Sequence, residues 1–150
     1  MKIESEGPPI GPKDISEIES ALGAELSAEY RDFLLLHNGG IPTPDTVDVP
    51  GAPQMPTDVL VFFGIRRSTE TSNLSWNLAL ISNRCPDCHV LPIACDSGGN
   101  LFCLKVERGV AAEVLYCDLG AECAIYPVAP TFGQFLNGLG KAMASSEPSC

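Results

Sequence analysis

The run Cys85-Pro86-Asp87-Cys88-His89 has the residue types and the spacing of several chemical sites. Two cysteines separated by two residues can hold zinc through their thiolates, and a following histidine offers a third ligand. Cys85, Cys88 and His89 are therefore candidate metal ligands. A structural zinc site needs four ligands, so a more distant cysteine would have to converge on the run through folding. The candidates for that position are Cys95, Cys117 and Cys123.

The same run has other interpretations. Cys-x-x-Cys-His is also the motif for covalent haem attachment, which we expect in exported proteins and set aside here. A thioredoxin-like redox pair precedes a helix whose dipole lowers the thiol pKa, whereas this pair precedes a predicted strand. A third interpretation is a pair of loop thiols with no essential role. We predict no bound cofactor, and zinc stays an alternative.

A second run, Asp96-Ser97-Gly98-Gly99, copies the segment around the nucleophilic serine of chymotrypsin-like proteases. That chemistry needs a histidine base supported by a buried carboxylate. The two histidines, His37 and His89, stand in a different sequence context, and 150 residues are too few for the two barrels of those proteases. We interpret the run as a turn between strands. No catalytic residue is predicted, and we expect the chain not to be an enzyme.

The charge balance excludes several classes of partner. Nine Lys and Arg stand against 19 Asp and Glu, which gives a formal net charge of −10. This charge repels phosphate backbones and anionic lipid surfaces, so we expect neither nucleic-acid binding nor membrane binding. The longest apolar stretch, residues 59–65, is far shorter than the ~20 residues of a membrane-spanning helix. A basic protein partner would instead be attracted at a raised association rate.

Cysteine usage bears on the compartment. Seven cysteines are many for this length, and the N-terminal residues contain no apolar segment of the kind found in secretion signals. An odd number of cysteines without an export signal does not indicate a disulfide framework. We therefore expect a cytoplasmic protein with reduced thiols, most of them packed as small hydrophobic side chains.

Helical periodicity predicts two helices in the first 40 residues. Asp14-x-x-Glu17 resembles a capping box, and apolar residues follow at helical spacing. Ser27 is the predicted N-cap of a second helix, which Asn38-Gly39-Gly40 ends. His37 lies near that end, where it can bond the last carbonyls of the helix. A third helix is predicted within residues 69–82, with Trp76 in the core.

Strands dominate the second half of the chain. Runs rich in β-branched and aromatic residues predict strands at residues 59–63, 89–95, 101–106, 113–118 and 124–128. A closing helix follows Thr131 and places Met143 inward. This order of elements predicts an α+β domain with a mixed, mostly antiparallel sheet and helices packed around it. Residues 41–56 contain five prolines, which excludes a helix or a central strand. A structureless stretch of that length is often a binding loop.

Three segments, taken in order, resemble one family. They are Ile15-x-x-Ile18-Glu19-x-x-Leu22-Gly23 with Leu26-x-x-x-Tyr30-x-x-Phe33-Leu34 and Asn38-Gly39-Gly40; Leu91-Pro92-Ile93-Ala94-Cys95-Asp96 with Gly98-Gly99-Asn100-Leu101; and Phe132-x-x-Phe135-Leu136. Together they resemble the SUKH superfamily, which holds the fungal cell-wall assembly and glucan-synthesis regulator and many bacterial immunity proteins. Ser27 stands where the family commonly has proline, and Asn100 where it often has aspartate. Both residues keep the local physics of a cap and a turn.

The resemblance implies a single SUKH-like α+β domain over residues 14–143, between an N-terminal extension (1–13) and a C-terminal tail (144–150). It also implies a protein that works by binding, because most bacterial members are thought to neutralise toxin domains delivered by competing cells. We expect Asp45, Asp48 and Asp58, in and beside the proline-rich loop, to steer a basic toxin domain. Alternatives are a regulatory scaffold of the cell-wall assembly type and a small zinc-binding module using Cys85 and Cys88. No particular oligomeric state is predicted.

Overall fold

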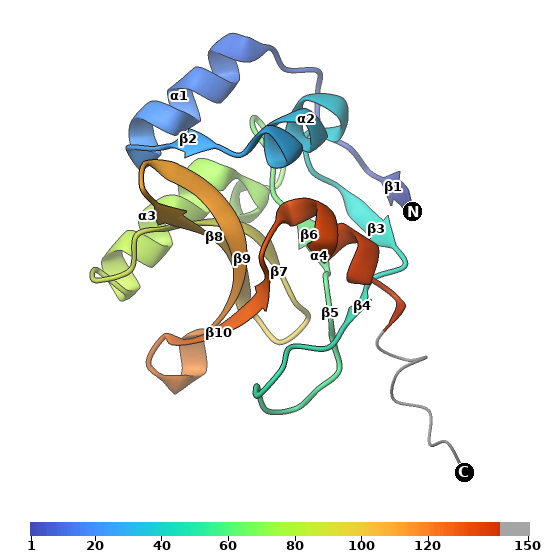
Figure 1. Ribbon diagram of the computed structural model, residues 1–150. Coiled ribbons are helices and arrows are strands. Elements are labelled where there is room, and N and C mark those ends of the chain that lie inside the picture. The colour runs from blue at the N-terminus through green and yellow to red at the C-terminus, as the bar shows by residue number, and fades with distance from the viewer. Residues whose placement is uncertain (142–150) are drawn as a thin grey trace.

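The computed structural model describes residues 1–141 and is drawn in Figure 1. Its helices are α1 (Pro12–Leu22), α2 (Ala28–His37), α3 (Leu74–Arg84) and α4 (Phe132–Gly138), with short 3-10 helices η1 (Glu70–Ser72) and η2 (Leu119–Ala121). Its strands are β1 (Lys2–Glu4), β2 (Glu25–Leu26), β3 (Ile41–Thr43), β4 (Thr46–Val47), β5 (Thr57–Asp58), β6 (Val61–Phe62), β7 (Val90–Cys95), β8 (Leu101–Glu107), β9 (Val110–Asp118) and β10 (Ala124–Ala129). The predicted α+β class with mostly antiparallel strands is confirmed.

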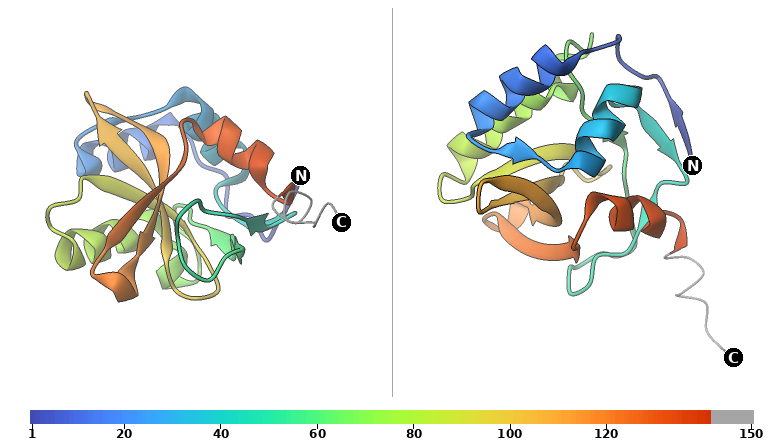
Figure 2. Two further views of the ribbon diagram at one scale, coloured as in Figure 1. Left: turned by 60° about the horizontal axis from the view of Figure 1, so that its bottom comes forward. Right: turned by 45° about the horizontal axis from the view of Figure 1, so that its top comes forward.

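The central sheet has the strand order β10-β9-β8-β7-β6, and each neighbouring pair is antiparallel. The short strand β2 adds to β9 in parallel. The β8–β9 connection is the two-residue turn Arg108-Gly109, in which φ is 53° and 80°. Positive φ at both central positions matches the twist of the flanking strands, and glycine adopts it without steric cost. The sheet is strongly curved, as both views in Figure 2 show.

One face of the sheet packs against α2 and α4 through aromatic rings. The centroid of Phe102 on β8 lies 5.3 Å from that of Phe135 on α4. Phe33 of α2 lies 5.0 Å from both Phe62 of β6 and Phe132 of α4. Tilted and edge-on pairs at these distances add to the free energy gained by burying each ring. The main core therefore lies between this face and the two helices.

The other face carries the alternate residues of the same strands, because side chains alternate along a strand. Leu101 and Cys103 of β8 lie opposite Cys117 and Leu115 of β9 on this face. The helix α3 packs against β7 and lies beside α1 (Figure 2, right). The chain that leaves α3 at Cys85 is thereby brought close to Cys117.

Most of the elements predicted for the second half are confirmed. The strands expected at 89–95, 101–106, 113–118 and 124–128 are β7, β8, β9 and β10. The closing helix is α4, and the Thr131 hydroxyl caps it by accepting from the Gln134 N–H at 3.1 Å. Met143 and the tail 144–150 lie outside the described residues. No helix within residues 1–141 has the length and apolar character needed to cross a membrane.

The first helix begins earlier than its sequence pattern predicts. Its N-cap is Gly11, and Asp14 is the third helical residue. The Asp14 carboxylate accepts from the Gly11 N–H at 2.9 Å. Asp14 therefore takes the role of the third helical residue in a capping box and is not the N-cap itself. The cap predicted at Ser27 is confirmed, because its hydroxyl accepts from the Tyr30 N–H at 3.4 Å.

The third helix differs more from its prediction. Asn73 separates η1 from α3, so the single helix expected over 69–82 becomes a 3-10 turn followed by an α-helix. The expected burial of Trp76 is wrong, since 36% of the residue is exposed. The buried stripe of α3 is Leu74, Asn77 and Ile81, and Trp76 points away from that stripe. Burial of Asn77 is possible because its amide donates to the carbonyl of Thr71 in η1 and to that of Asn73, the N-cap of α3.

The proline-rich stretch 41–56 holds short strands. β3 pairs with β1, and β4 pairs with β5, each in a two-stranded sheet outside the central one. The predicted absence of a helix and of a central strand is confirmed, but the stretch is not structureless. Pro42 lies within β3 opposite Ile3, in a sheet with only two strands, where a missing N–H costs no central ladder bond.

Candidate functional site

The three aspartates predicted to bind a partner lie at the β4–β5 hairpin. Thr46 of β4 is opposite Asp58 of β5, and the Val59 N–H donates to the Asp45 carbonyl at 2.8 Å. Asp48 directly follows β4. Asp45 and Asp48 are exposed, whereas Asp58 is half-buried. The structure therefore brings all three aspartates to one hairpin, but Asp58 is less accessible to a partner than the other two.

Asp58 is bound within the chain. Its carboxylate accepts from the backbone N–H of Ser97 at 2.8 Å and from the Ser97 hydroxyl. These two donors occupy acceptor positions that a partner would otherwise use. Asp45 and Asp48 are therefore the carboxylates of the hairpin that are exposed to a partner, while Asp58 ties the hairpin to the turn between β7 and β8.

Buried side chains and hydrogen bonds also hold the hairpin against the rest of the domain. Val47 and Val49 are buried on either side of the exposed Asp48. The Val49 N–H donates to Met55 Sδ at 3.3 Å, and the Gly140 N–H donates to the Thr46 carbonyl at 2.7 Å. Two buried neighbours leave Asp48 few backbone conformations, so less ordering entropy is lost when a partner binds it.

Asp96 is the buried centre of the β7–β8 turn, with 3% of its surface exposed. Its carboxylate accepts from the hydroxyls of Thr57 and Tyr116 and from the N–H groups of Gly98 and Asn100. The predicted turn is thus confirmed. Because Thr57 belongs to β5, Asp96 also joins the acidic hairpin to the central sheet. Burial and the bond to Asp96 raise the pKa of Tyr116, which keeps its hydroxyl protonated and donating.

Neither histidine is placed to activate Ser97. His37 Nδ1 lies 2.8 Å from Glu6 Oε2, and His89 Nε2 lies 2.8 Å from the carbonyl oxygen of Leu22. The expectation that His37 bonds the last carbonyls of α2 is wrong, because the ring turns to Glu6 instead, and the Leu34 carbonyl accepts from the Asn38 N–H. Within residues 1–141, Ser97 contacts Asp58 and no histidine.

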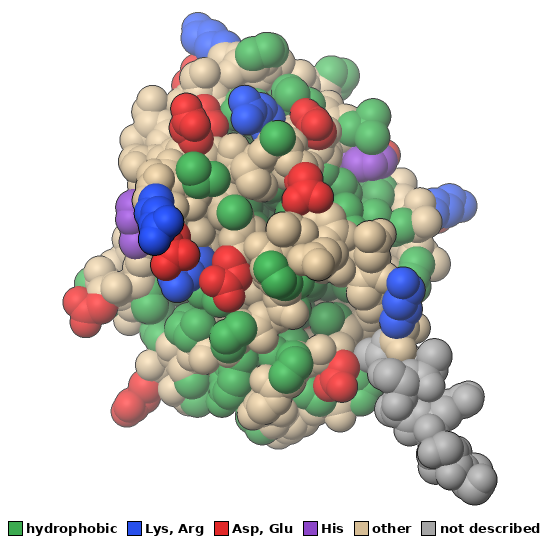
Figure 3. Space-filling view, viewed as in Figure 1, with side chains coloured by type: hydrophobic (Ala, Val, Ile, Leu, Met, Phe, Trp, Pro, Cys, Tyr) green, Lys and Arg blue, Asp and Glu red, His purple; other side chains and the backbone are tan. Residues whose placement is uncertain are grey.

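Two hollows border the edge strand β10. The larger, about 490 Å³, is lined by Pro127, Val128, Ala129 and Pro130 and by residues at the β8–β9 turn ends of those two strands. The smaller, about 280 Å³, also has Val128 and Ala129 in its lining, together with Asp48 and residues of α4. Figure 3 shows hydrophobic side chains gathered on this part of the molecule, below the more charged upper half. Because both hollows are lined by Val128 and Ala129, we refer to the two together as the β10 groove.

Charged residues border the β10 groove. Lys105, Glu107 and Glu113 line its larger part, and Asp48 and Lys141 line the smaller one. An apolar floor with a charged rim is the arrangement found in protein-binding surfaces. Asp48 therefore belongs both to the hairpin and to the groove.

The sequence segments that resemble the SUKH superfamily include residues with clear structural roles in this fold. Asn38 ends α2 in the left-handed conformation (φ 52°) and is buried, and Asp96 organises the β7–β8 turn. The family model described as SMI1 / KNR4 family (SUKH-1) matches residues 9–138. The chain belongs to the SUKH-1 family. A search of curated proteins finds no match. Members of the SUKH-1 family are generally not enzymes.

Sequence reasoning about this SUKH-1 chain missed two features of the site. The β10 groove was not predicted, because it depends on how the end of α4 and the β4–β5 hairpin meet an edge strand. The central role of Asp96 was not predicted either, although a carboxylate in a glycine-rich turn was a visible signal. Side-chain bonds from Asp to the backbone two residues onward are common in such turns.

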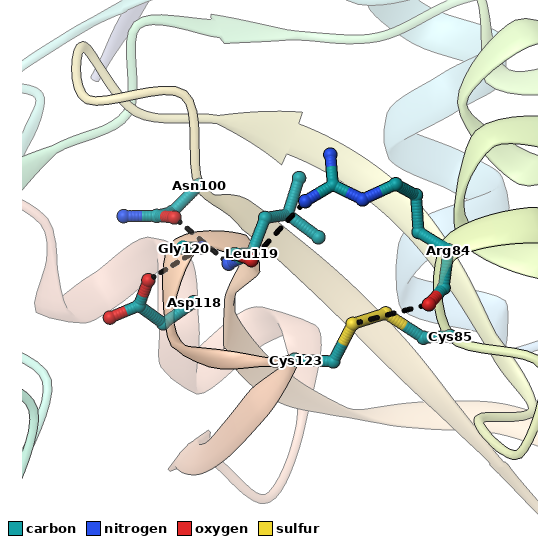
Figure 4. Close-up of a disulfide and its surroundings, with 7 residues drawn as sticks. All are labelled: Arg84, Cys85, Asn100, Asp118, Leu119, Gly120 and Cys123. Atoms are coloured by element: carbon teal, nitrogen blue, oxygen red, sulfur yellow. Dashed lines mark hydrogen bonds between the residues drawn. A yellow bond between two sulfur atoms is a disulfide. The ribbon is translucent and has the colours of Figure 1, made fainter.

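The cysteines of this SUKH-1 chain are not all reduced. Cys85 forms a disulfide with Cys123, with 6.3 Å between their Cα atoms (Figure 4). The expectation of reduced thiols is wrong for this pair, because the turn between β9 and β10 brings Cys123 to the end of α3. Cys103 and Cys117 are buried, as expected of small hydrophobic side chains. Burial raises the pKa of Cys103 well above its usual value and that of Cys117 to about 11.

Proposed function

We propose that this SUKH-1 chain is a non-enzymatic protein-binding domain that acts in the cytoplasm as an immunity protein and neutralises a cognate toxin domain by direct binding. The observation that supports this most is the exposed pair Asp45 and Asp48 on an anchored hairpin beside the β10 groove. The partner surface consists of this hairpin and the groove. Asp58 supports this surface without contacting the partner, because it holds the hairpin against the β7–β8 turn.

The chemistry of this surface favours a basic partner with an apolar anchor. The chain carries a net charge of −10, and the hairpin exposes two carboxylates, of which that of Asp48 lines the groove. Such a field accelerates the encounter with a positively charged protein. The apolar floor around Val128 and Ala129 would then bury a hydrophobic side chain of the partner, which slows dissociation. A toxin domain that acts on nucleic acid has the required positive charge.

A binding measurement tests the surface. The variant Asp45→Lys/Asp48→Lys reverses the free charges of the hairpin, and Glu17→Lys/Glu70→Lys makes the same change in net charge at exposed positions on α1 and η1. We expect the first variant to associate with the toxin about tenfold more slowly, with a weaker dependence on salt. The control variant should associate at close to the original rate. Equal rates for both variants at all salt concentrations would show that this surface is not the interface.

A cell experiment tests the immunity role itself. A toxin-like C-terminal domain encoded next to this gene is expressed with and without the chain, and survival is compared. We expect rescue, a complex of the two purified proteins, and loss of rescue for Asp45→Lys/Asp48→Lys. A neighbouring toxin that still kills, or a neighbour without toxicity, contradicts the immunity role and favours a regulatory scaffold of the cell-wall assembly type.

A further inference from the structure

Three cysteines from distant parts of the chain gather on the face of the sheet that lies away from the aromatic core. Cys85 ends α3, Cys117 lies in β9 and Cys123 precedes β10. Their sulfur atoms all lie within 4.8 Å of one another. In a tetrahedral zinc site with Zn–S distances near 2.3 Å, sulfur atoms are about 3.8 Å apart. The Cys117 sulfur thus lies beside the disulfide, and the sulfurs of Cys85 and Cys123 reach the zinc spacing only after the disulfide is reduced and they move apart.

Cys88 is placed to supply the fourth sulfur. Its N–H donates to the Cys85 carbonyl at 3.0 Å, which closes a turn over Pro86 and Asp87. Cys-x-x-Cys on a tight turn is the spacing with which structural zinc sites hold two thiolates from one segment. Cys88 is half-buried and outside the disulfide. It lines one hollow with Ile125 of β10, which is the register partner of Cys117 in β9. Its side chain would have to turn toward Cys117 to join the other three sulfurs.

The turn that carries Cys123 is held in place independently of the sulfurs. Arg84 donates to the Leu119 carbonyl at 3.3 Å, and Asp118 accepts from the Gly120 N–H at 3.1 Å, as Figure 4 shows. Glu122 and Cys123 both have positive φ (56° and 61°). Two consecutive non-glycine residues in this region are held against their preference. Arg84 also brings a positive charge near a site whose four thiolates and one Zn²⁺ would carry a net charge of −2.

We propose that the reduced protein binds one Zn²⁺ through Cys85, Cys88, Cys117 and Cys123. The zinc form and the disulfide form exclude each other, because both use the sulfurs of Cys85 and Cys123. A dithiol reductant converts the disulfide into two thiols and is itself oxidised to a cyclic disulfide. The four thiols then bind Zn²⁺ and release four protons to the solvent, so the site closes only under reducing conditions. The four cysteines complete the coordination of the ion, so His89, whose Nε2 is bonded to the Leu22 carbonyl, is not needed as a ligand.

The site is structural and independent of the proposed partner surface. Four protein ligands close the coordination sphere and leave no position for a substrate. The ion would join the end of α3 to β9 and to the turn before β10, as the disulfide joins α3 to that turn. In a reducing compartment, zinc would therefore replace the disulfide as the link that positions the start of β10, the strand that forms one side of the β10 groove.

Cobalt titration of the full chain tests the proposal. The protein is reduced with excess dithiothreitol, the reductant is removed without oxygen, and Co²⁺ is added alone. We expect one Co²⁺ per chain, with thiolate-to-cobalt charge-transfer bands and the visible bands of a tetrahedral ion, and displacement by Zn²⁺ at one equivalent. The disulfide form, titrated in the same way, should show none of these bands.

Two matched variants make the test specific. Cys88→Ser removes a ligand that is outside the disulfide and half-buried, so the fold should persist, and we expect at least about a hundredfold loss of affinity. Cys95→Ser changes a cysteine at the far end of β7 and should bind as the original chain does. Circular dichroism checks that both variants are folded. The proposal fails if the reduced, folded chain binds no metal, if the disulfide form binds equally well, or if Cys88→Ser binds as tightly as Cys95→Ser.

Discussion

The side-chain amide of Asn38 is bonded to both backbone groups of Ile65. Its Oδ1 accepts from the Ile65 N–H at 2.7 Å, and its Nδ2 donates to the Ile65 carbonyl at 2.8 Å. The same Nδ2 donates to the Pro8 carbonyl at 2.8 Å. One buried amide thus joins the end of α2 to the chain after β6 and to the segment before α1. Glycine could adopt the same backbone conformation at the end of α2, but it has no side chain to make these three bonds.

The exchange Asn38→Asp tests this joint. Aspartate keeps the shape but loses both donated bonds, and it brings a charge among the carbonyls of Pro8 and Ile65. Because Asn38 is only 2% exposed, we expect the free energy of unfolding to fall by about 3 kcal/mol or more, from unpaired buried groups and an unpaired charge. Denaturant unfolding measures it. Asn83→Asp, at an exposed position of α3, is the control and should stay within about 0.5 kcal/mol.

Gly64 packs directly on the same joint. A Cβ added there would overlap the carbonyl oxygen of Asn38 and lie 2.8 Å from its Oδ1. Neither atom can move without breaking hydrogen bonds, because the carbonyl oxygen accepts from Gly7 and Arg67 and Oδ1 accepts from Ile65. Since the φ of Gly64 is not positive, the cost of Gly64→Ala comes from this overlap alone. We expect a loss of about 2–3 kcal/mol in denaturant unfolding. Gly138→Ala, in α4 with nothing within 4 Å, should instead be neutral or gain up to about 1 kcal/mol. Equal effects of the two changes would contradict the close packing.

Periodicity and cap residues predicted most of the elements because these signals act over a few neighbouring residues. Ser27 and Thr131 cap the helices that they were expected to cap, and β7 to β10 lie where β-branched and apolar runs place them. Trp76 was misplaced because an apolar residue was assumed to face the core. The bonds from Asn77 to two carbonyls made a polar residue the better choice for that position.

The parts of the site that could not be predicted depend on contacts between distant segments. The Cys85–Cys123 pair requires α3 to end beside the β9–β10 turn, 38 residues later in the chain. From the sequence, the Asp58 side chain was expected to be available to a partner, like that of Asp45. The fold brings the β7–β8 turn next to it, and the Ser97 N–H donates to the Asp58 carboxylate. Spacing along the chain carries no information about either approach.

Asp96→Ala tests whether the buried carboxylate holds the acidic hairpin. The change leaves the donors of Thr57, Gly98, Asn100 and Tyr116 without their acceptor. We expect a loss of about 3 kcal/mol or more in the free energy of unfolding and faster amide exchange in β5 and the β7–β8 turn. Hydrogen exchange measures the second effect. Unchanged exchange in β5 would show that the hairpin does not depend on Asp96.

Asp14 should contribute a stability that depends on acidity. The Arg66 side chain and the Gly11 N–H donate to its carboxylate and lower its pKa below the usual 3.8. A group whose pKa is lower in the folded state stabilises that state above the unfolded pKa, and this contribution disappears as the pH falls through the folded pKa. We therefore expect Asp14→Asn to be less stable than the original chain at about pH 7 and to approach it below about pH 3.8. Thermal unfolding over this range measures the difference, and a gap that stays constant with pH would exclude Asp14 as its source. Asp32→Asn, at an exposed position of α2, is the matched control.

Tyr30 is the position where removing a polar atom should stabilise the chain. Its ring is 1% exposed and packs edge-on against Phe132 at 5.1 Å, but its hydroxyl has no hydrogen-bond partner among the described residues. Burial of this hydroxyl raises its pKa far above the usual value. Burying a hydroxyl that makes no hydrogen bond costs free energy, because its bonds to water are lost and not replaced. Tyr30→Phe should therefore raise the free energy of unfolding by about 1 kcal/mol.

Tyr116→Phe is the matched control, because the Tyr116 hydroxyl donates to Asp96 and accepts from Asn100. Its loss should lower the free energy of unfolding by about 1–2 kcal/mol. Denaturant unfolding of the two variants should therefore give changes of opposite sign, and a destabilised Tyr30→Phe variant would mean that its hydroxyl has a partner in solution.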